Sequence, residues 1–400
     1  MDILVVSQFY YPDEFRVNDI TRQLAADGHT VHVLTGLPDY ATSRVPKEYR
    51  FGRKRRETVE GVDILRVPII ARRHGMIFRV LNYLSFVIAG RLKARFCSLR
   101  PDVILSYETS PVLQVLPAIT MHRRRRVPLI IYCCDIWPEC LKVWGVQESS
   151  PVFKYIKRLS RKIFNAGDLV AITSEPFRTY LREVNEVPEE KIVELPQHAE
   201  DVYGDLVGTY EDNGCVDFLF AGNIGAAQNV DVIVRAAALL RDKTGENWQV
   251  HLVGDGSEKA ACEQLAADLG VTDRVTFHGK FPLCEMERFY RLSDCFLLTI
   301  SGDDVGRMTL PAKWQGYISA GKPVLASADG ATARMMELAD CGDSTPAGDA
   351  EALAAAMGRV IADPAAYRAK GLNGRRYYEE HFTKERFMHR LYELIDQVKK

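Results

Sequence analysis

The sequence predicts an α/β protein built from two doubly wound, mostly parallel sheets. Its 400 residues exceed one ordinary hydrophobic core and suit two domains. Near-continuous apolar runs alternate with helical patterns in both halves, as expected of parallel strands covered on both faces. A polar, turn-rich stretch at 195–214 interrupts this rhythm. We therefore expect one domain at 1–203 and another at 204–380, with a terminal helix at 381–400 that can cross back to the first domain.

The first half is expected to begin with a strand at once, without a signal peptide. Helices are expected at 18–27 and 76–99. Strands are expected at 3–7, within 28–36, and at 62–67, 102–106, 129–133 and 169–173.

The second half repeats the alternation. Strands are expected at 216–221, 248–253, 274–277, 295–299 and 323–326. Helices are expected at 231–240, 312–320, 350–361 and 384–399. Two such domains would put the carboxyl ends of two sheets across one cleft, where ligands bind in α/β proteins.

Composition indicates a soluble globular protein with an uneven charge. Residues 1–200 carry 30 Lys and Arg against 23 Asp and Glu, whereas residues 201–400 carry 22 against 30. The basic half is expected to meet an anionic surface or substrate. Nine cysteines without metal-ligand spacing are typical of buried thiols in a reducing cytoplasm. No apolar stretch is long enough to span a bilayer.

The stretch FAGNIGAAQN, residues 220–229, joins a predicted strand to a predicted helix through small residues. Such loops bind phosphate through backbone N–H groups and a helix N-terminus. A dinucleotide-binding motif is excluded after the first strand, because QFYYPDEFRVND has no glycine. The later LVGDGSEKA has Gly254 and Gly256 but Lys259 where a third glycine is needed.

The order of motifs resembles a known family. GNIGAAQN, LVGDG, VTFHGKFP, SDCFLL and LPAKWQGYISAGKPVLAS follow one another as in the C-terminal domain of retaining glycosyltransferases of family 4, which have the GT-B fold. VVSQFYYPDEFRVNDI, GHTVHVLTGLPDY, NYLSF and CCDIWPE are similar to a bacterial branch that builds O-antigen, capsule and exopolysaccharide, and that includes fucosaminyl and colanic-acid-type transferases.

The resemblance implies a nucleotide diphosphate sugar, usually UDP-linked, as donor. Its diphosphate would lie against Gly222–Gly225 and the N-terminus of the following helix. Asn223, Gln228 and Gly254 are further candidates for donor binding. Two departures matter. Many members have Arg and Lys where this chain has Asn223 and Gln228, and the family's two glutamates fall on Met308 and Gly316.

Other residues would therefore have to hold the donor. Lys313 falls in the first turn of the helix predicted at 312–320, where a cation is unfavourable unless an anion lies beside it. Lys313 and Arg307 are candidates for the diphosphate, although both could be solvated surface residues. Asp303 and Asp304 could bind donor-sugar hydroxyls or form a solvated turn.

The acceptor side is expected in the first domain. Asp135 of CCDIWPE follows a strand and could orient or deprotonate the acceptor hydroxyl, or instead cap a helix that contains Pro138. Further candidates are Glu14, in a loop that closes over the acceptor in relatives, and Tyr107, Glu108 and His198. No metal cluster is evident and no cofactor is expected, so phosphate departure and positioning would carry the reaction.

The acceptor implied by the resemblance is a saccharide on polyprenyl diphosphate. We therefore expect a cytoplasmic enzyme attached peripherally to the inner membrane. The basic residues expected at the anionic membrane surface are Arg53, Lys54, Arg55, Arg56, Arg72, Arg73 and Arg79. The helix at 76–99 is rich in apolar and basic residues, so it could lie at this membrane surface, or it could be a core helix with a charged end. No nucleic-acid motif accompanies the charge. The alternatives in function are a nucleotide-sugar epimerase of the same fold and a donor-binding subunit without turnover.

Overall fold

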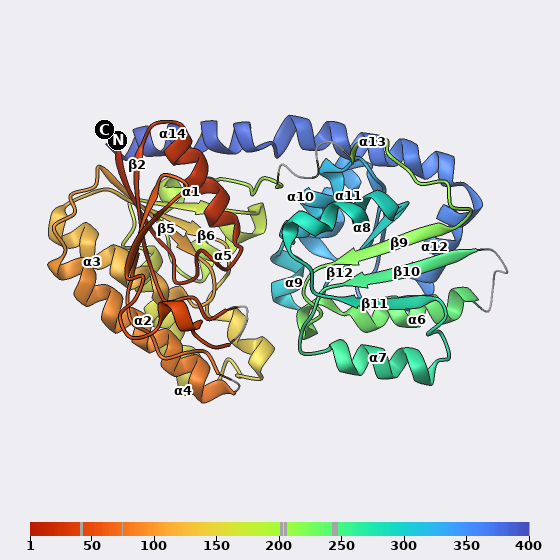
Figure 1. The fold of residues 1–400 in the computed structure, drawn as a ribbon, viewed down its shortest axis with the longest axis horizontal. Coiled ribbons are helices and arrows are strands. Elements are labelled where there is room, and N and C mark those ends of the chain that lie inside the picture. Colours follow the sequence, from red (N-terminus) through yellow and green to blue (C-terminus); the bar gives the residue numbers. More distant parts are fainter. Residues whose placement is uncertain (41–42, 74, 201–202, 204–205, 242–246, 400) are drawn as a thin grey trace. The chain divides into compact units, whose positions relative to one another are not determined.

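The computed structural model describes residues 1–400 except 41–42, 74, 201–202, 204–205, 242–246 and 400, and except the side chains of residues 143 and 144 (Figure 1). The chain forms two compact units. The first unit comprises Met1–Leu195 together with Met388–Lys400, and the second comprises Pro196–Phe387. The divisions thus follow Leu195 and Phe387, whereas the sequence placed them after residues 203 and 380.

The first unit is built on an eight-stranded sheet with the order β3–β4–β2–β1–β5–β6–β7–β8. Its strands are β1 (Asp2–Val6), β2 (Thr30–Thr35), β3 (Arg56–Val59), β4 (Val62–Arg66), β5 (Val103–Glu108), β6 (Leu129–Cys133), β7 (Leu169–Ile172) and β8 (Ile192–Glu194). All neighbours are parallel except β3 and β4. The antiparallel edge strand β3 is absent from the expected elements. Its turn residues Glu60 and Gly61 have φ values of 52° and 80°, the pattern of a tight hairpin.

The helices of the first unit follow the alternation. They are α1 (Arg16–Ala26), α2 (Met76–Phe96), α3 (Leu116–Arg125), α4 (Pro151–Phe164), α5 (Glu175–Glu183) and most of α14 (Lys384–Lys399), with short 3₁₀ turns η1 (Lys47–Tyr49), η2 (Val112–Val115), η3 (Glu139–Trp144) and η4 (Glu189–Lys191). Helix α4 was not expected from the sequence. It begins with Ser150, whose Oγ accepts a hydrogen bond from the N–H of Phe153 at 3.1 Å, followed by Pro151.

The second unit contains an all-parallel sheet with the order β11–β10–β9–β12–β13–β14. Its strands are β9 (Val216–Ala221), β10 (Trp248–Val253), β11 (Val275–Gly279), β12 (Cys295–Thr299), β13 (Val324–Ser327) and β14 (Gly342–Thr345). The strand order reverses between β9 and β12, so the loops that follow these two strands flank the topological switch point, where α/β sheets bind ligands.

Helices cover this sheet on both sides. They are α6 (Val230–Arg241), α7 (Lys259–Asp268), α8 (Met286–Leu292), α9 (Asp304–Met308), α10 (Ala312–Ser319), α11 (Gly330–Ala339), α12 (Ala350–Ala362) and α13 (Pro364–His381), with short turns η6 (Ala226–Gln228) and η7 (Leu283–Glu285). Phe218 and Phe220 enter one apolar cluster, and Leu219 and Ala221 enter another. Because alternate residues of β9 face opposite sides, the sheet is buried on both faces, as the apolar runs predicted.

Candidate functional site

Two glycine-containing loops pack backbone to backbone beside the switch point. A Cβ atom on Gly254 would lie 1.8 Å from the carbonyl oxygen of Gly222, and one on Gly256 would lie 2.2 Å from that of Ile224. The N–H of Ile224 donates to the carbonyl of Asp255 at 2.9 Å. The glycines of the second loop are therefore required by this close approach of the two loops, before any ligand is considered.

The first loop runs from Gly222 to Gln228 and is tied to the end of β12. The N–H of Ser301 donates to the carbonyl of Ala227 at 2.9 Å. The side-chain amide of Asn223 donates to Oε1 of Gln228 at 2.8 Å. Helix α6 does not start directly after the loop, because η6 and Asn229, at φ 45°, intervene. A ligand at this loop would therefore meet amides of the loop and η6 rather than the N-terminus of a long helix.

Lys313, the second residue of α10, brings its ammonium group to this loop. A Cβ on Gly222 would meet its Nζ at 2.8 Å, and Nζ lies 3.7 Å from the centroid of the Phe220 ring. Among the described residues the buried Nζ has no hydrogen-bond partner. Burial lowers the pKa of Lys313 to about 7. A buried cation without a partner is costly, so the site favours an anion beside Nζ.

Tyr317 lies one turn after Lys313 on α10 and holds the same segment. Its hydroxyl accepts from the N–H of Ala221 at 2.8 Å and lies 3.2 Å from the carbonyl of Ala221, to which it donates. Tyr317 was missed from the sequence, although its spacing of four residues from Lys313 places both side chains on one face of the helix. Together they fix the end of β9 and the glycine that follows.

The residues predicted around Lys313 have structural contacts of their own. Asp303 caps α9, because its Oδ1 accepts from the N–H of Gly306 at 2.7 Å. Arg307 is exposed, donates to the carbonyl of Gly302 at 2.9 Å and pairs with Asp329 at 3.4 Å. Asp304, the first residue of α9, is also exposed.

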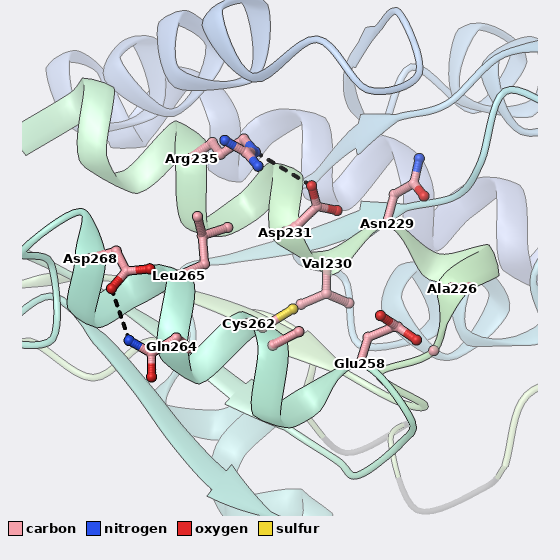
Figure 2. Close-up of a pocket in the computed structure, with 12 residues that line it drawn as sticks. Ala226, Asn229, Val230, Asp231, Arg235, Glu258, Cys262, Gln264, Leu265 and Asp268 are labelled. Atoms are coloured by element: carbon pink, nitrogen blue, oxygen red, sulfur yellow. Dashed lines mark hydrogen bonds and ion pairs between the residues drawn. The ribbon is translucent and has the colours of Figure 1, made fainter.

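A cavity of about 550 Å³ opens between α6 and α7 beside the same loop (Figure 2). It touches Gly225 and Ala226, but three carboxylates line it: Asp231, Glu258 and Asp268. The nearby Arg235 is paired with Asp231 at 3.4 Å. Repulsion from these carboxylates disfavours a diphosphate in this cavity.

In the first unit, two carboxyl groups lie at the carboxyl ends of β5 and β6. Glu108 is fully buried, and neither of its carboxylate oxygens has a hydrogen-bond partner among the described residues. Burial, and secondly the charge of Asp135, raise the pKa of Glu108 well above its usual value. Burial also raises the pKa of Asp135, against hydrogen bonds from Ser110 that lower it. Burial therefore disfavours ionisation of both carboxyl groups, and the charge of Asp135 further disfavours that of Glu108.

The capping alternative for Asp135 is wrong. The next element, η3, begins at Glu139 after Pro138, and no side chain caps it. Asp135 is partly exposed and follows the strand end, as the sequence predicted. Tyr107 is buried, with its ring 5.5 Å from that of Tyr132.

The other predicted acceptor-side residues have different surroundings. Glu14 is exposed in the loop before α1. His198 is buried against the ring of Phe387, at 4.7 Å between ring centroids, and both residues belong to the second unit. The sequence had placed His198 in the first domain.

A buried polar network under the loops of the first unit was also missed. The amide of Asn82, from α2, accepts from Gln8 Nε2 and donates to Asp39 Oδ2, both at 2.8 Å. The N–H of Gln8 donates to Gln114 Oε1 at 2.8 Å. Burial raises the pKa of Asp39 to about 6. No sequence period marks this network, because its members come from four separate segments.

The predicted membrane cations have differing surroundings. The guanidinium of Arg72 stacks on the rings of Tyr40 and Phe9, at 4.9 and 5.8 Å from their centroids. Lys54 pairs with Glu57 at 3.8 Å, and Arg55 is partly buried. The remaining members are Arg53 and Arg56, which are exposed, Arg73, which lies over Phe78, and Arg79, which is partly buried on α2.

Comparison with known proteins follows the division into two units. Residues 14–198 match the family described as "Glycosyl transferase 4-like domain", and residues 211–377 match "Glycosyl transferases group 1". The chain is therefore a glycosyltransferase with the GT-B fold, of the family 4 type. Within the described residues, no group of three or more His, Cys, Asp or Glu side chains could hold a metal ion.

Two curated relatives are similar over different lengths. The lipopolysaccharide core biosynthesis glycosyltransferase LpsD of Rhizobium meliloti (strain 1021) is 32% identical over 168 residues, 40% of this chain and 45% of LpsD. The putative colanic acid biosynthesis glycosyl transferase WcaI of Escherichia coli (strain K12) is 24% identical over 357 residues, 83% of this chain and 84% of WcaI. The match thus spans less than half of LpsD but most of WcaI.

Solved structures match over nearly the whole chain. Sucrose-phosphate synthase from Thermosynechococcus elongatus superposes with a TM-score of 0.77 at 20% identity, covering 99% of this chain and 98% of that one. HepE of Anabaena, in complex with UDP, superposes with a TM-score of 0.70 at 16% identity over 100% of both chains. At such identities the likeness establishes the fold alone.

Proposed function

We propose that this enzyme is a retaining glycosyltransferase that moves a sugar from a nucleotide diphosphate sugar, most simply a UDP-sugar, to a saccharide on polyprenyl diphosphate. The product would enter bacterial surface polysaccharide, and the reaction would occur at the cytoplasmic face of the inner membrane. The observation that carries this proposal is the buried Nζ of Lys313 beside Gly222, which has no hydrogen-bond partner in the described part of the chain. An ammonium group held there needs an anion, and a donor diphosphate supplies one.

The identity of the donor draws support from relatives of the fold. HepE of Anabaena has been solved with UDP and with UDP-glucose. The role in polysaccharide assembly draws support from LpsD and WcaI, whose names refer to lipopolysaccharide core and colanic acid. Lys313 would neutralise the leaving diphosphate, with loop amides near Gly222 as further donors. The charge of Lys313 would take the place of the Arg and Lys charges that many family members have at the positions of Asn223 and Gln228.

The acceptor would meet the first unit at the end of β6. Asp135 is the proposed group that orients or deprotonates the acceptor hydroxyl, because it is partly exposed at the end of β6 whereas Glu108 is fully buried. We propose that the reaction needs no metal and no cofactor. Charge stabilisation by Lys313 and positioning of the acceptor would carry it instead.

No helix in the described part of the chain combines the length and hydrophobicity that crossing a bilayer requires. A lipid-linked acceptor stays in the bilayer, so the proposed enzyme would work from the membrane surface.

The deciding experiment is a panel of nucleotide sugars in thermal-shift assays with three proteins. The wild type should be stabilised by one donor class, since a ligand that binds only the folded state raises the melting temperature. Lys313→Met should lose most of this shift. Lys259→Met is the matched control, because Lys259 starts α7 and pairs with Glu263 at 3.4 Å. An equal shift in wild type and Lys313→Met would remove Lys313 from the donor site.

Incubation with the stabilising donor separates the alternatives. Conversion of the sugar without any acceptor would indicate an epimerase. Binding without turnover in the presence of lipid-linked saccharide acceptors would indicate a donor-binding subunit. Transfer to the lipid fraction, with retention of the anomeric configuration, is the expected result.

A further inference from the structure

Exposed apolar side chains are concentrated in the first unit. Of the seventeen large apolar side chains exposed among the described residues, fifteen belong to this unit and eight to α2 alone. The second unit exposes only Leu338 and Leu372 in its described part. Scattered exposed apolar residues are ordinary on a protein surface, but eight on one helix indicate a binding surface.

The exposed apolar residues of α2 form a continuous stripe. Ile77 is 75% exposed, Leu81 38%, Leu84 44% and Ile88 62%, and their spacing of three or four residues places them on one side of the helix. The opposite side is buried and includes Asn82, which is tied into the polar network of the unit. Arg91 and Arg95 continue the stripe at its C-terminal end. The orientation of the stripe is therefore fixed by the core of the unit.

Helix α4 has a basic exposed side. Lys154, Arg158 and Lys162 are exposed, together with Tyr155 at 64% and Val152 at 59%. The buried side of α4 includes Phe153 and Ile163. This spacing is that of an amphipathic helix whose outer side combines cations with apolar side chains, which is typical of helices at a membrane surface.

Both helices lack acidic residues, and both pack against the short turn η2. No Asp or Glu occurs anywhere in 64–101 or 149–167. The two exposed sides therefore flank one element of the first unit and carry only positive charge. A partner that covers both sides must bind apolar side chains and must itself neutralise the cations, because this chain has no acidic residues in these two segments.

We propose that the exposed sides of α2 and α4 form one surface that docks the first unit on an anionic lipid bilayer. The stripe of α2 would enter the boundary between headgroups and acyl chains, and the cations of α4 would bind anionic headgroups. This inference rests on the proposed function, because a lipid-linked acceptor requires such docking. It keeps the helix at 76–99 from the surface expected from the sequence and adds α4, whereas Arg72 and Lys54 have contacts within the unit.

The charge distribution favours lipid over a second copy of the chain. Two copies joined through these sides would bring clusters of like charge together without acids to neutralise them, which opposes association. A bilayer with anionic lipid offers both an apolar interior and negative charge.

The test is co-sedimentation with phosphatidylcholine vesicles, with and without an equimolar amount of phosphatidylglycerol. Two variants separate the components: Lys154, Arg158 and Lys162 changed to Glu on α4, and Ile77, Leu81, Leu84 and Ile88 changed to Ser on α2. The α4 variant should bind anionic vesicles at least tenfold more weakly and neutral vesicles unchanged. The α2 variant should lose binding to both. The matched control is Leu338→Ser with Leu372→Ser in the second unit, which should bind like wild type.

Folding and donor binding are checked separately. Each variant should keep a cooperative melt and the thermal shift given by the donor, so that loss of vesicle binding reports the surface alone. Wild-type vesicle binding without any donor shift would refute the proposed function and leave the surface standing. The surface is refuted if both variants bind vesicles like wild type, or if the α2 changes convert a dimer into a monomer in sedimentation.

Discussion

The Nζ atom of Lys313 lies 3.7 Å from the centroid of the Phe220 ring, and no described residue accepts a hydrogen bond from it. The ring face offers a weak attraction for a cation, but no hydrogen-bond acceptor. The protein thus keeps an amine buried at the end of β9 at a cost to its own stability. Such an arrangement is typical of ligand sites, where a bound group supplies the missing partner.

Replacing Lys313 should therefore have opposite effects on stability and on donor binding. Lys313→Met removes the buried amine, so the unliganded protein should resist urea better than wild type. Donor binding should weaken by about 1.5–3 kcal/mol, the usual worth of a hydrogen bond to a charged group. Urea unfolding and calorimetric titration measure the two effects. A destabilised variant with normal affinity would show that the lysine serves the fold.

Donor binding should also take up a proton above neutrality. The pKa of Lys313 is about 7, so at pH 8 the amine is mostly neutral, and an anion beside it favours the charged form. We expect uptake of about one proton per nucleotide sugar bound at pH 8, and affinity that weakens as pH rises above 7. Calorimetry in two buffers of different ionisation heat measures the uptake. Equal proton uptake by Lys313→Met would assign the proton to another group.

Glu108 should make stability depend on pH. Its folded-state pKa is raised by burial, so the folded protein binds a proton that the unfolded chain has released above about pH 4.5. Stability is therefore lost as pH rises toward the folded pKa, by up to about 1.4 kcal/mol per pH unit. Glu108→Gln removes this dependence. In urea unfolding, the free energy of unfolding of the variant relative to wild type should be higher at pH 8 than at pH 5.

The control for Glu108 is Glu183→Gln, because Glu183 is exposed. It should follow wild type at both pH values. Parallel behaviour of Glu108→Gln and wild type would mean that Glu108 ionises normally.

Asp135 should affect rate rather than folding. Asp135→Asn keeps the shape of the side chain but removes the charge, so kcat should fall by about 10²-fold or more while the melting temperature changes little. Asp212→Asn, at an exposed carboxylate of the second unit, is the control. A normal kcat in Asp135→Asn would transfer the role to another group, with Glu14 the next to change.

The contact between the two glycine loops can be tested with a single methyl group. In Gly256→Ala, the new Cβ would lie 2.2 Å from the carbonyl oxygen of Ile224, so the loops must separate. We expect a loss of stability of about 2 kcal/mol or more and weaker donor binding. In Gly358→Ala the nearest atom is Leu240 Cδ1 at 3.7 Å, and this helical change should stabilise by about 0.5–1 kcal/mol. Equal melting temperatures for the two variants would contradict the packing argument.

The sequence predicted the fold class and many elements, because strands buried on both faces leave unbroken apolar runs. The bounds of β6, β9, β10 and β12 coincide with those expected. Strand β3 was missed because its side chains are polar and it lies at an edge. Helix α4 was missed although Ser150 and Pro151 mark its start. The miss of α4 has a different character, because its 14 residues bury Phe153, Ile163 and Phe164 on one side and so do carry a periodic signal.

The site was predicted less completely, for a physical reason. Lys313 could be singled out because a lysine in the first turn of a helix is unfavourable there. Its lack of a partner, its contact with Phe220 and the complete burial of Glu108 depend on packing between segments distant in sequence. The buried hydrogen bonds among Gln8, Asn82 and Asp39 also depend on packing between distant segments.

The return of residues 388–400 to the first unit has a consequence for biosynthesis. Leu391, Leu394 and Ile395 of α14 are buried, and the hydroxyl of Tyr392 donates to Asp27, more than 360 residues earlier in the chain. On the ribosome, the first unit is thus translated early but waits for the end of the chain to cover its last apolar surface. A fragment ending at Leu195 would expose that surface, and we expect it to aggregate or to recruit chaperones. Supplying 384–400 as a separate peptide should restore its solubility.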